Sequence, residues 1–222
     1  MIPRSRKHKE TLAWAFMLVV MLPLLMLGGC KATPITGVLS VQSLKNEPVL
    51  LESNFTTAVF TNEPQTETSF WLSDVSVQDL LAGRVVEGQI VHVEMIWSPK
   101  AGSTPMDSSA TNASIRYVVI SHGEVGIYIG AGYAIPSGDL QGSSVTLSIR
   151  DASLRLGEST PGFIDLLGPA QISGQFTATR DAKKARSLFV SVSQYVTDSL
   201  GKTRFVKNSV APKTKSNASN SS

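Results

Sequence analysis

Apolar and polar side chains alternate along several short runs of this chain, and that period of two is the feature that most limits its fold. The clearest run is residues 84–97. One alternate set there is Val91, Val93, Met95 and Trp97, and the set between is His92, Glu94 and Ile96. Because successive side chains of a β-strand point to opposite faces of a sheet, we expect the first set to be buried and His92 to face outward beside Glu94.

Further strands are predicted wherever β-favouring residues or the same alternation recur between turn residues. They fall at residues 35–44, 49–61, 69–73, 115–120, 125–129, 145–156 and 172–179. The run 49–61 is either a strand pair or one long bent strand. Ser121 to Glu124 contains a glycine in a short polar link and predicts a hairpin turn, whereas the glycines and proline of 130–138 predict a loop. Trp71 and Trp97 are expected to fill the core.

The period changes from two to 3.6 between Asp181 and Leu200, where apolar residues recur at helical spacing. Asp181 is a suitable N-cap and Gly201 follows the last periodic residue, so we predict a helix, with a strand at 188–196 as the competing interpretation. A shorter helix is predicted at 76–81. Together these patterns predict a mainly β fold: an antiparallel β-sandwich or an open barrel of seven to nine strands, with a C-terminal helix packed on it.

The first thirty residues combine a basic start, an apolar run and a cysteine. Four basic residues precede the run at 12–27, and Leu27-Gly28-Gly29 then leads to Cys30, the only cysteine. This order is typical of a secretory signal peptide. The sixteen residues of the run fall short of the ~20 that cross a bilayer as a helix. An uncleaved anchor and an ordinary signal peptide cut nearby are the alternatives.

Leu27 to Cys30 resembles the lipobox of bacterial lipoproteins, and this resemblance covers only the signal segment. It implies a lipoprotein signal peptide at 1–29 and cleavage before Cys30. Lipid such as palmitate would then be carried on Cys30, the bilayer would be a partner through that acylated residue, and 30–36 would be a short lipidated tether. It also implies a lipid-anchored, extracytoplasmic location in the cell envelope. Lys31 stands where an inner-membrane retention signal would carry Asp, which favours the outer membrane if the cell has one.

The charge distribution argues against a role in binding nucleic acid. Residues 1–29 hold four of the 20 basic and one of the 17 acidic residues, so 16 of each remain beyond them. From Lys202 onward there are five basic residues and no acidic ones, which leaves a net charge of −5 on residues 31–201. We therefore expect a β-rich globular domain at 37–201 with an acidic body, followed by a disordered basic tail at 202–222.

No catalytic or metal-binding signature stands out in the sequence, and no cofactor is expected. His92 and Glu94 lie on one strand face, but two ligands are too few for a closed metal site. His122 lies in the predicted turn before Glu124. Carboxylates are plentiful, and a glycosidase needs only two at a suitable separation.

Residues 160–169 form an apolar stretch bracketed by Pro and Gly. If exposed, the segment would contact a partner or a membrane, and if packed, it would be a helical turn closing the fold. The candidate contact residues are Phe163, Ile164, Leu166 and Leu167.

Two hypotheses about function follow. The first is a membrane-anchored envelope lipoprotein with a non-enzymatic binding, structural or assembly role and a partner protein in the envelope. The second is a carboxylate-dependent hydrolase acting on cell-wall or carbohydrate material. Two carboxylates facing a cleft near Trp97 or Tyr128 would favour the second hypothesis, and an apolar surface near Phe163 would favour the first.

Overall fold

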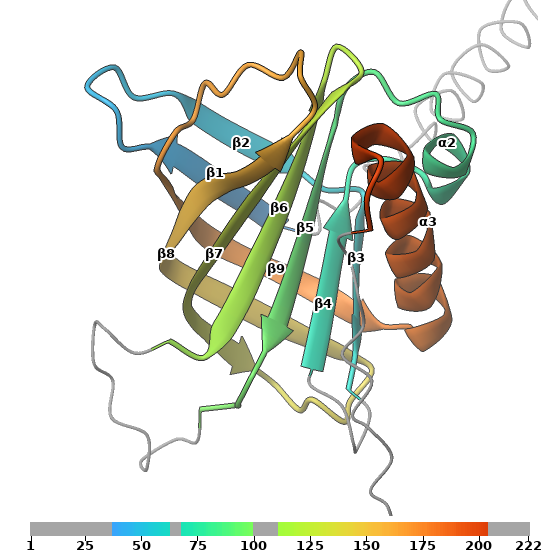
Figure 1. Ribbon diagram of the computed structural model, residues 1–222. Coiled ribbons are helices and arrows are strands. Elements are labelled where there is room, and N and C mark those ends of the chain that lie inside the picture. The colour runs from blue at the N-terminus through green and yellow to red at the C-terminus, as the bar shows by residue number, and fades with distance from the viewer. Residues whose placement is uncertain (1–36, 63–67, 100–110, 204–222) are drawn as a thin grey trace, which may run out of the picture. The chain divides into compact units, whose positions relative to one another are not determined.

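The computed structural model of the protein describes residues 37–62, 68–99 and 111–203 (Figure 1). The predictions for the signal peptide, Cys30, the tether and residues 204–222 lie outside this part of the chain. The elements, in chain order, are β1 (Gly37–Ser43), β2 (Leu50–Asn54), β3 (Thr57–Thr61), β4 (Thr68–Ser73), α2 (Val77–Leu81), β5 (Gly88–Met95), β6 (Ala113–Ser121), β7 (Glu124–Ser137), β8 (Ser144–Ser159), β9 (Ala170–Arg180) and α3 (Ala182–Leu200).

The nine described strands form a single sheet in the order β2-β1-β9-β3-β4-β5-β6-β7-β8, and this sheet closes on itself. Closure occurs because β9 pairs with β8 along one edge, while β1 and then β3 share its other edge. All of these pairs are antiparallel except the short pairing between β3 and β9. The prediction of a mainly β, antiparallel fold with a C-terminal helix packed on it is confirmed.

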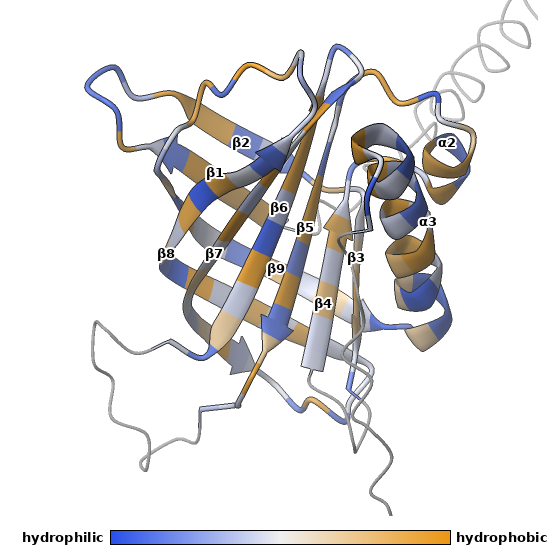
Figure 2. Cartoon of the chain, in the orientation of Figure 1, coloured by the Kyte–Doolittle hydropathy of each residue, from blue (hydrophilic) through white to orange (hydrophobic). Residues whose placement is uncertain are grey.

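The larger of two apolar clusters lies inside the closed sheet, where the inward-facing side chains of its strands meet. Phe60, Phe70 and Phe176 lie at its centre, with ring centroids 5.5 Å apart for the first pair and 5.9 Å for the second. The predicted inward set Val91, Val93 and Met95 belongs to this cluster. Figure 2 shows the corresponding pattern along β8 and β9, where hydrophobic and hydrophilic residues alternate.

The second apolar cluster lies on the outer face of the sheet, beneath α3 (Figure 1). Outward-facing Val59, Trp71 and Ile120 meet Leu188 and Val192 of the helix there. The helix has the predicted ends. The Asp181 side chain accepts a hydrogen bond from the Lys184 amide at 2.8 Å, and Gly201 adopts the left-handed conformation that ends helices without strain.

The hairpin between β6 and β7 is confirmed at the predicted residues. Ser121 pairs with Glu124, and the two residues between them, His122 and Gly123, have φ of 54° and 80°. Positive φ at both central positions is the geometry of a two-residue turn that matches the twist of its flanking strands.

The loop predicted from the glycines of 130–138 is wrong, because β7 continues to Ser137. These glycines instead allow β8 to approach closely near its register shift. A Cβ atom at Gly130 would lie 1.7 Å from the Ser153 carbonyl oxygen, and one at Gly132 would lie 2.3 Å from the Ala152 Cβ. The run 49–61, for which two interpretations were open, forms two strands.

Candidate functional site

A cavity of about 310 Å³ lies beneath the segment that joins β8 to β9. Its walls come from the β1–β2 connection, the start of β5, the end of β6 and the β8–β9 segment. The apolar lining residues are Val49, Leu51, Val119, Ile120, Phe163, Ile164, Leu166 and Leu167. The polar ones are Asp74, Glu87, Gln89, Ser121 and Tyr128. Sequence reasoning singled out the β8–β9 segment but not the cavity beneath it.

The β8–β9 segment is held in place at both ends by hydrogen bonds. Thr160 Oγ1 accepts one from the Val125 amide at 2.9 Å. Asp165 Oδ1 accepts one from the Tyr128 hydroxyl at 2.6 Å and one from the Gly168 amide at 2.7 Å. The segment contains turns but no helix, so neither of the two predicted forms describes it fully.

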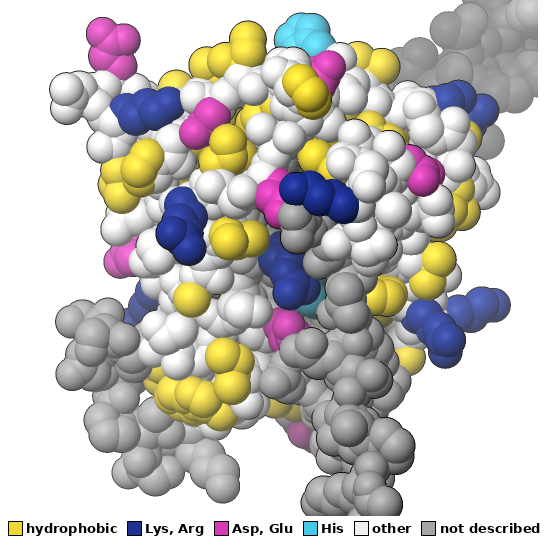
Figure 3. All heavy atoms as spheres, in the orientation of Figure 1, with side chains coloured by type: hydrophobic (Ala, Val, Ile, Leu, Met, Phe, Trp, Pro, Cys, Tyr) yellow, Lys and Arg dark blue, Asp and Glu magenta, His cyan; other side chains and the backbone are white. Residues whose placement is uncertain are grey.

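The four candidate contact residues divide between the surface and the interior. Ile164 and Leu166 are 75% and 62% exposed, whereas Leu167 is only 2% exposed and belongs to the inner core. Phe163 is half-buried and meets the Tyr128 ring edge-on, with centroids 6.3 Å apart. In Figure 3, hydrophobic side chains gather along the upper edge, where Figure 1 draws the segment between β8 and β9. Leu167 is therefore a core residue and does not form part of the contact surface that the exposed form of this segment would provide.

Phe163 fits against the sheet because β7 has a glycine opposite it. A Cβ atom at Gly126 would lie 2.2 Å from the Phe163 ring. Such a contact is far inside van der Waals separation, so any larger residue at position 126 would displace the ring. The missing side chain at Gly126 of β7 thus leaves room for the Phe163 ring, which forms one wall of the cavity.

Two tyrosines of the inner core, Tyr117 and Tyr128, have ring centroids 6.1 Å apart, and Tyr128 also lines the cavity. Burial raises the pKa of Tyr117. Burial also raises the pKa of Tyr128, and its hydrogen bond to Asp165 adds to that effect. Both phenols therefore stay protonated at neutral pH and act as hydrogen-bond donors: Tyr128 to Asp165, and Tyr117 to the side-chain oxygen of Gln89.

Two carboxylates line the same cavity, one on each side of the α2 connection. Asp74 Oδ1 accepts a hydrogen bond from the Gln89 amide at 2.7 Å, and burial raises the pKa of Asp74 in spite of it. Glu87 Oε1 accepts one from the His122 amide at 2.9 Å. Both carboxylates are thus positioned by backbone groups of the sheet and its hairpin.

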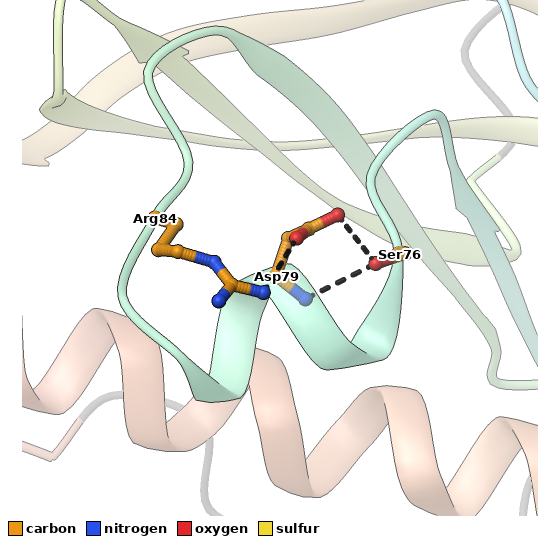
Figure 4. Close-up of polar contacts among 3 residues, drawn as sticks. All are labelled: Ser76, Asp79 and Arg84. Carbon is orange, nitrogen blue, oxygen red and sulfur yellow. Dashed lines mark hydrogen bonds and ion pairs between the residues drawn. The ribbon is translucent and has the colours of Figure 1, made fainter.

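Helix α2 fixes the connection that carries these carboxylates (Figure 4). Ser76 caps the helix by accepting a hydrogen bond from the Asp79 amide at 3.1 Å, and its hydroxyl donates to Asp79 Oδ2 at 2.6 Å. Arg84 reaches Asp79 Oδ1 at 3.4 Å from the other side. The hydrogen bond from Ser76 and then that from Arg84 lower the pKa of Asp79. This agrees with the short helix predicted at 76–81.

Ser121, His122 and Glu87 lie together at the mouth of the cavity, but their geometry does not form a proton relay. The Ser121 hydroxyl and Glu87 Oε1 approach the same ring nitrogen of His122, Nδ1, at 3.1 Å and 3.6 Å. A Ser–His–acid relay needs the hydroxyl and the carboxylate on different ring nitrogens. The three residues instead make polar contacts at the exposed β6–β7 turn.

His92 is buried, contrary to the sequence expectation that it faces solvent. Its ring stacks on Trp71 with centroids 4.1 Å apart, and its Nε2 lies 2.8 Å from the Ser69 hydroxyl. Burial, and then the charge of Arg116, lowers the pKa of His92 to about 3. Its outward direction was predicted correctly, but α3 and its aromatic neighbours cover that face of the sheet.

Of the two tryptophans expected in the core, only Trp71 lies there. Strand β5 ends at Met95, and Trp97 beyond it is 39% exposed, with its ring 6.2 Å from that of Tyr133. Among the described residues, no three His, Cys, Asp or Glu side chains are grouped so that they would hold a metal ion. Nor does any helix in that part of the chain combine the length and apolar character needed to cross a membrane.

The chain matches no family model, and it matches neither a curated protein nor a solved structure.

Proposed function

We propose that the protein is a lipid-anchored lipoprotein of the cell envelope with a non-enzymatic binding role, and that the cavity beneath the β8–β9 segment is its ligand site. The observation that carries the proposal is this cavity of about 310 Å³, with a mostly apolar lining and a few convergent polar groups. Ligand pockets typically have that composition and begin at about 300 Å³.

The exposed side chains of Ile164 and Leu166 support the same proposal. Both line the cavity while remaining largely exposed at the surface. The segment that carries them is held by hydrogen bonds at both ends. Exposed apolar side chains on such a fixed segment are typical of a contact surface. A ligand or an envelope partner protein that covers them would bury apolar area from both molecules.

The anchoring part of the proposal rests on the lipobox-like sequence that ends at Cys30. Residues 31–36 add at most about 22 Å of extended chain before β1 begins. Acylation of Cys30 would therefore keep the domain close to a bilayer, and Lys31 favours the outer membrane where one exists. The acidic body argues against nucleic acid as a partner.

A hydrolase using two carboxylates is the second candidate, because Asp74 and Glu87 line one cavity near Tyr128. Each of these carboxylates has one oxygen engaged by a backbone amide. The turn His122 does not act as a relay for Ser121, as described above. Binding without turnover is the function we favour.

The ligand site is tested by titrating the domain with indole, a compact neutral apolar probe, and following backbone NMR shifts. We expect shifts to concentrate at residues 49–51, 119 and 163–167. Val119→Phe fills the cavity and should abolish them, while the matched Val190→Phe, at a half-exposed position on α3, should not. Indole shifts that survive Val119→Phe, or that lie elsewhere, would overturn the proposed site.

The anchor is tested by labelling cells with an alkyne analogue of palmitate. The wild-type chain should carry the label and partition with membranes. Cys30→Ser should lose the label and accumulate as an unprocessed species. If the Cys30→Ser chain is processed normally and stays membrane-bound, the lipid anchor is refuted and the cavity proposal is untouched.

A further inference from the structure

The charged side chains that line the cavity are all acidic. Asp74 and Glu87 are the charged residues among its lining groups in the described part of the chain, and that lining contains no Lys or Arg. Lys45 lies near the same segment, but its ammonium donates to the carbonyl oxygens of Asp165 and Leu166, at 2.8 and 3.3 Å. The formal charge of the cavity's lining is therefore negative.

Each of the two carboxylates also has an oxygen that other described residues leave without a hydrogen bond. The contacts that Asp74 makes with other described residues use Oδ1, and those of Glu87 use Oε1. Asp74 Oδ2 and Glu87 Oε2 accept no hydrogen bond from another described residue. The Asp74 carboxylate also accepts a hydrogen bond from its own backbone amide. Both residues line the cavity, so a ligand there would meet their carboxylate groups as hydrogen-bond acceptors.

The apolar walls set the other half of the ligand's chemistry. Val119, Phe163 and Leu167 face the same space as the two carboxylates. A ligand that fills it must bury a compact apolar body and present a hydrogen-bond donor towards Asp74 and Glu87. An anionic ligand of the same size would instead bring like charges together in a partly desolvated site.

We propose that the cavity selects a compact apolar group carrying an ammonium, so that the cation meets Asp74 and Glu87 while the apolar body lies against Val119 and Phe163. This inference rests on the proposed ligand site and names the chemical class of its ligand. Two sources supply that chemistry: a free aromatic or aliphatic amine, and the N-terminal residue of a peptide.

Three probes that share one ring system test the charge selection: tryptamine, indole and indole-3-acetate. By NMR titration at neutral pH and low salt, we expect tryptamine to bind about tenfold or more tightly than indole-3-acetate, with indole between them. A factor of ten corresponds to about 1.4 kcal/mol, the scale of one partly screened charge pair. The difference should shrink as salt is raised.

The double variant Asp74→Asn, Glu87→Gln keeps the shape of the lining and removes its charge. We expect it to reduce the preference for tryptamine to about twofold or less while indole binds as before. Asp151→Asn is the matched control, because it removes an exposed carboxylate outside the cavity at a residue with φ of 44°, which Asn tolerates. It should leave the preference intact.

The outcomes separate this inference from the function on which it rests. If indole binds at the cavity but tryptamine and indole-3-acetate bind equally, the charge selection is overturned and the ligand site stands. If no probe shifts the cavity residues, the ligand site itself fails. A tryptophanyl-glycine amide that matches tryptamine, while its N-acetylated form binds no more tightly than indole, would assign the site to a peptide N-terminus. Binding of tryptamine alone would assign it to free amines.

Discussion

The strands beneath α3 and the strands on the other side of the closed sheet differ in how many of their faces are buried. On the side beneath α3, consecutive residues of β4 are buried: Phe70 and Leu72 in the inner cluster, and Trp71 in the outer one. On the other side, β9 buries Ile172 and exposes Gln171. The difference arises because α3 covers one outer face, so that the strands beneath it contribute to two apolar clusters at once.

This comparison shows that the period of two reports burial only where one face of a strand meets water. Strands β8 and β9 have such a face, and there buried residues such as Leu147 and Ile172 alternate with more exposed ones. Strands β4 and β5 have both faces covered in part, so that an outward-pointing residue such as His92 is buried as well. The position of α3 therefore decides what the alternation means.

Among the substitutions that test this comparison, the largest change in the free energy of unfolding is expected at Trp71. Trp71→Ala removes a large side chain from the outer cluster, and we expect the free energy of unfolding to fall by about 3–5 kcal/mol. Thr177→Ala, on the exposed outer face of β9, removes a cross-strand hydroxyl contact with Thr146 and should cost about 1 kcal/mol or less. Chemical denaturation measures both. Similar losses at the two positions would show that α3 does not distinguish the two outer faces.

The buried His92 tests the same contrast through the pH dependence of stability. The pKa of His92 is about 3 in the folded protein and should lie near 6.5 in the unfolded chain. Above pH 6.5 His92 is neutral in both states. Between about pH 6.5 and 3 the unfolded chain binds a proton that the folded protein does not. As the pH is lowered through this range, the free energy of unfolding should therefore fall by about 1.4 kcal/mol per pH unit.

Urea denaturation across this pH range, compared between variants, isolates the contribution of His92. His92→Gln should remove this part of the pH dependence. If the pH dependence survives in His92→Gln, then His92 is accessible to protons in the folded protein and its outer face is not sealed.

A smaller effect is expected at the start of α3. Asp181→Ala removes the side chain that caps the helix and should cost about 1 kcal/mol. Asp198→Ala, which removes an exposed contact with Gln194 inside the same helix, should cost about 0.5 kcal/mol or less. Hydrogen exchange of the helix amides together with denaturation distinguishes the two variants. Equal costs would mean that tertiary packing alone determines where α3 begins.

Local features of the fold were predictable because their causes are local. The hairpin at Ser121 to Glu124 follows from a glycine in a two-residue turn. The ends of α3 follow from Asp181 and Gly201. The glycines of 130–138 were misread because the reason for them lies on another strand: Gly130 makes room for the backbone of Ser153. A glycine that permits a turn and one that permits close approach look alike in a sequence.

The candidate site was only partly predictable for the same reason. Residues 160–169 stood out as an apolar segment, and two of its four candidate contact residues, Ile164 and Leu166, are largely exposed. Nothing in the sequence pattern relates them to Asp74, Glu87 or Val119. These residues come together because the sheet closes through pairing of β8 with β9, and closure is a long-range event.

The sequence by itself determined most of the strands, both helices and the β6–β7 turn, since alternation, turn chemistry and capping act between neighbours along the chain, but it did not reveal that β7 continues to Ser137. It also carries the signal-like segment that ends at Cys30. Only the tertiary structure decided which strand faces are covered, why His92 is buried while Trp97 is exposed, and which side chains enclose the cavity. Burial depends on what lies opposite a residue in space, and residues far apart in the chain supply it.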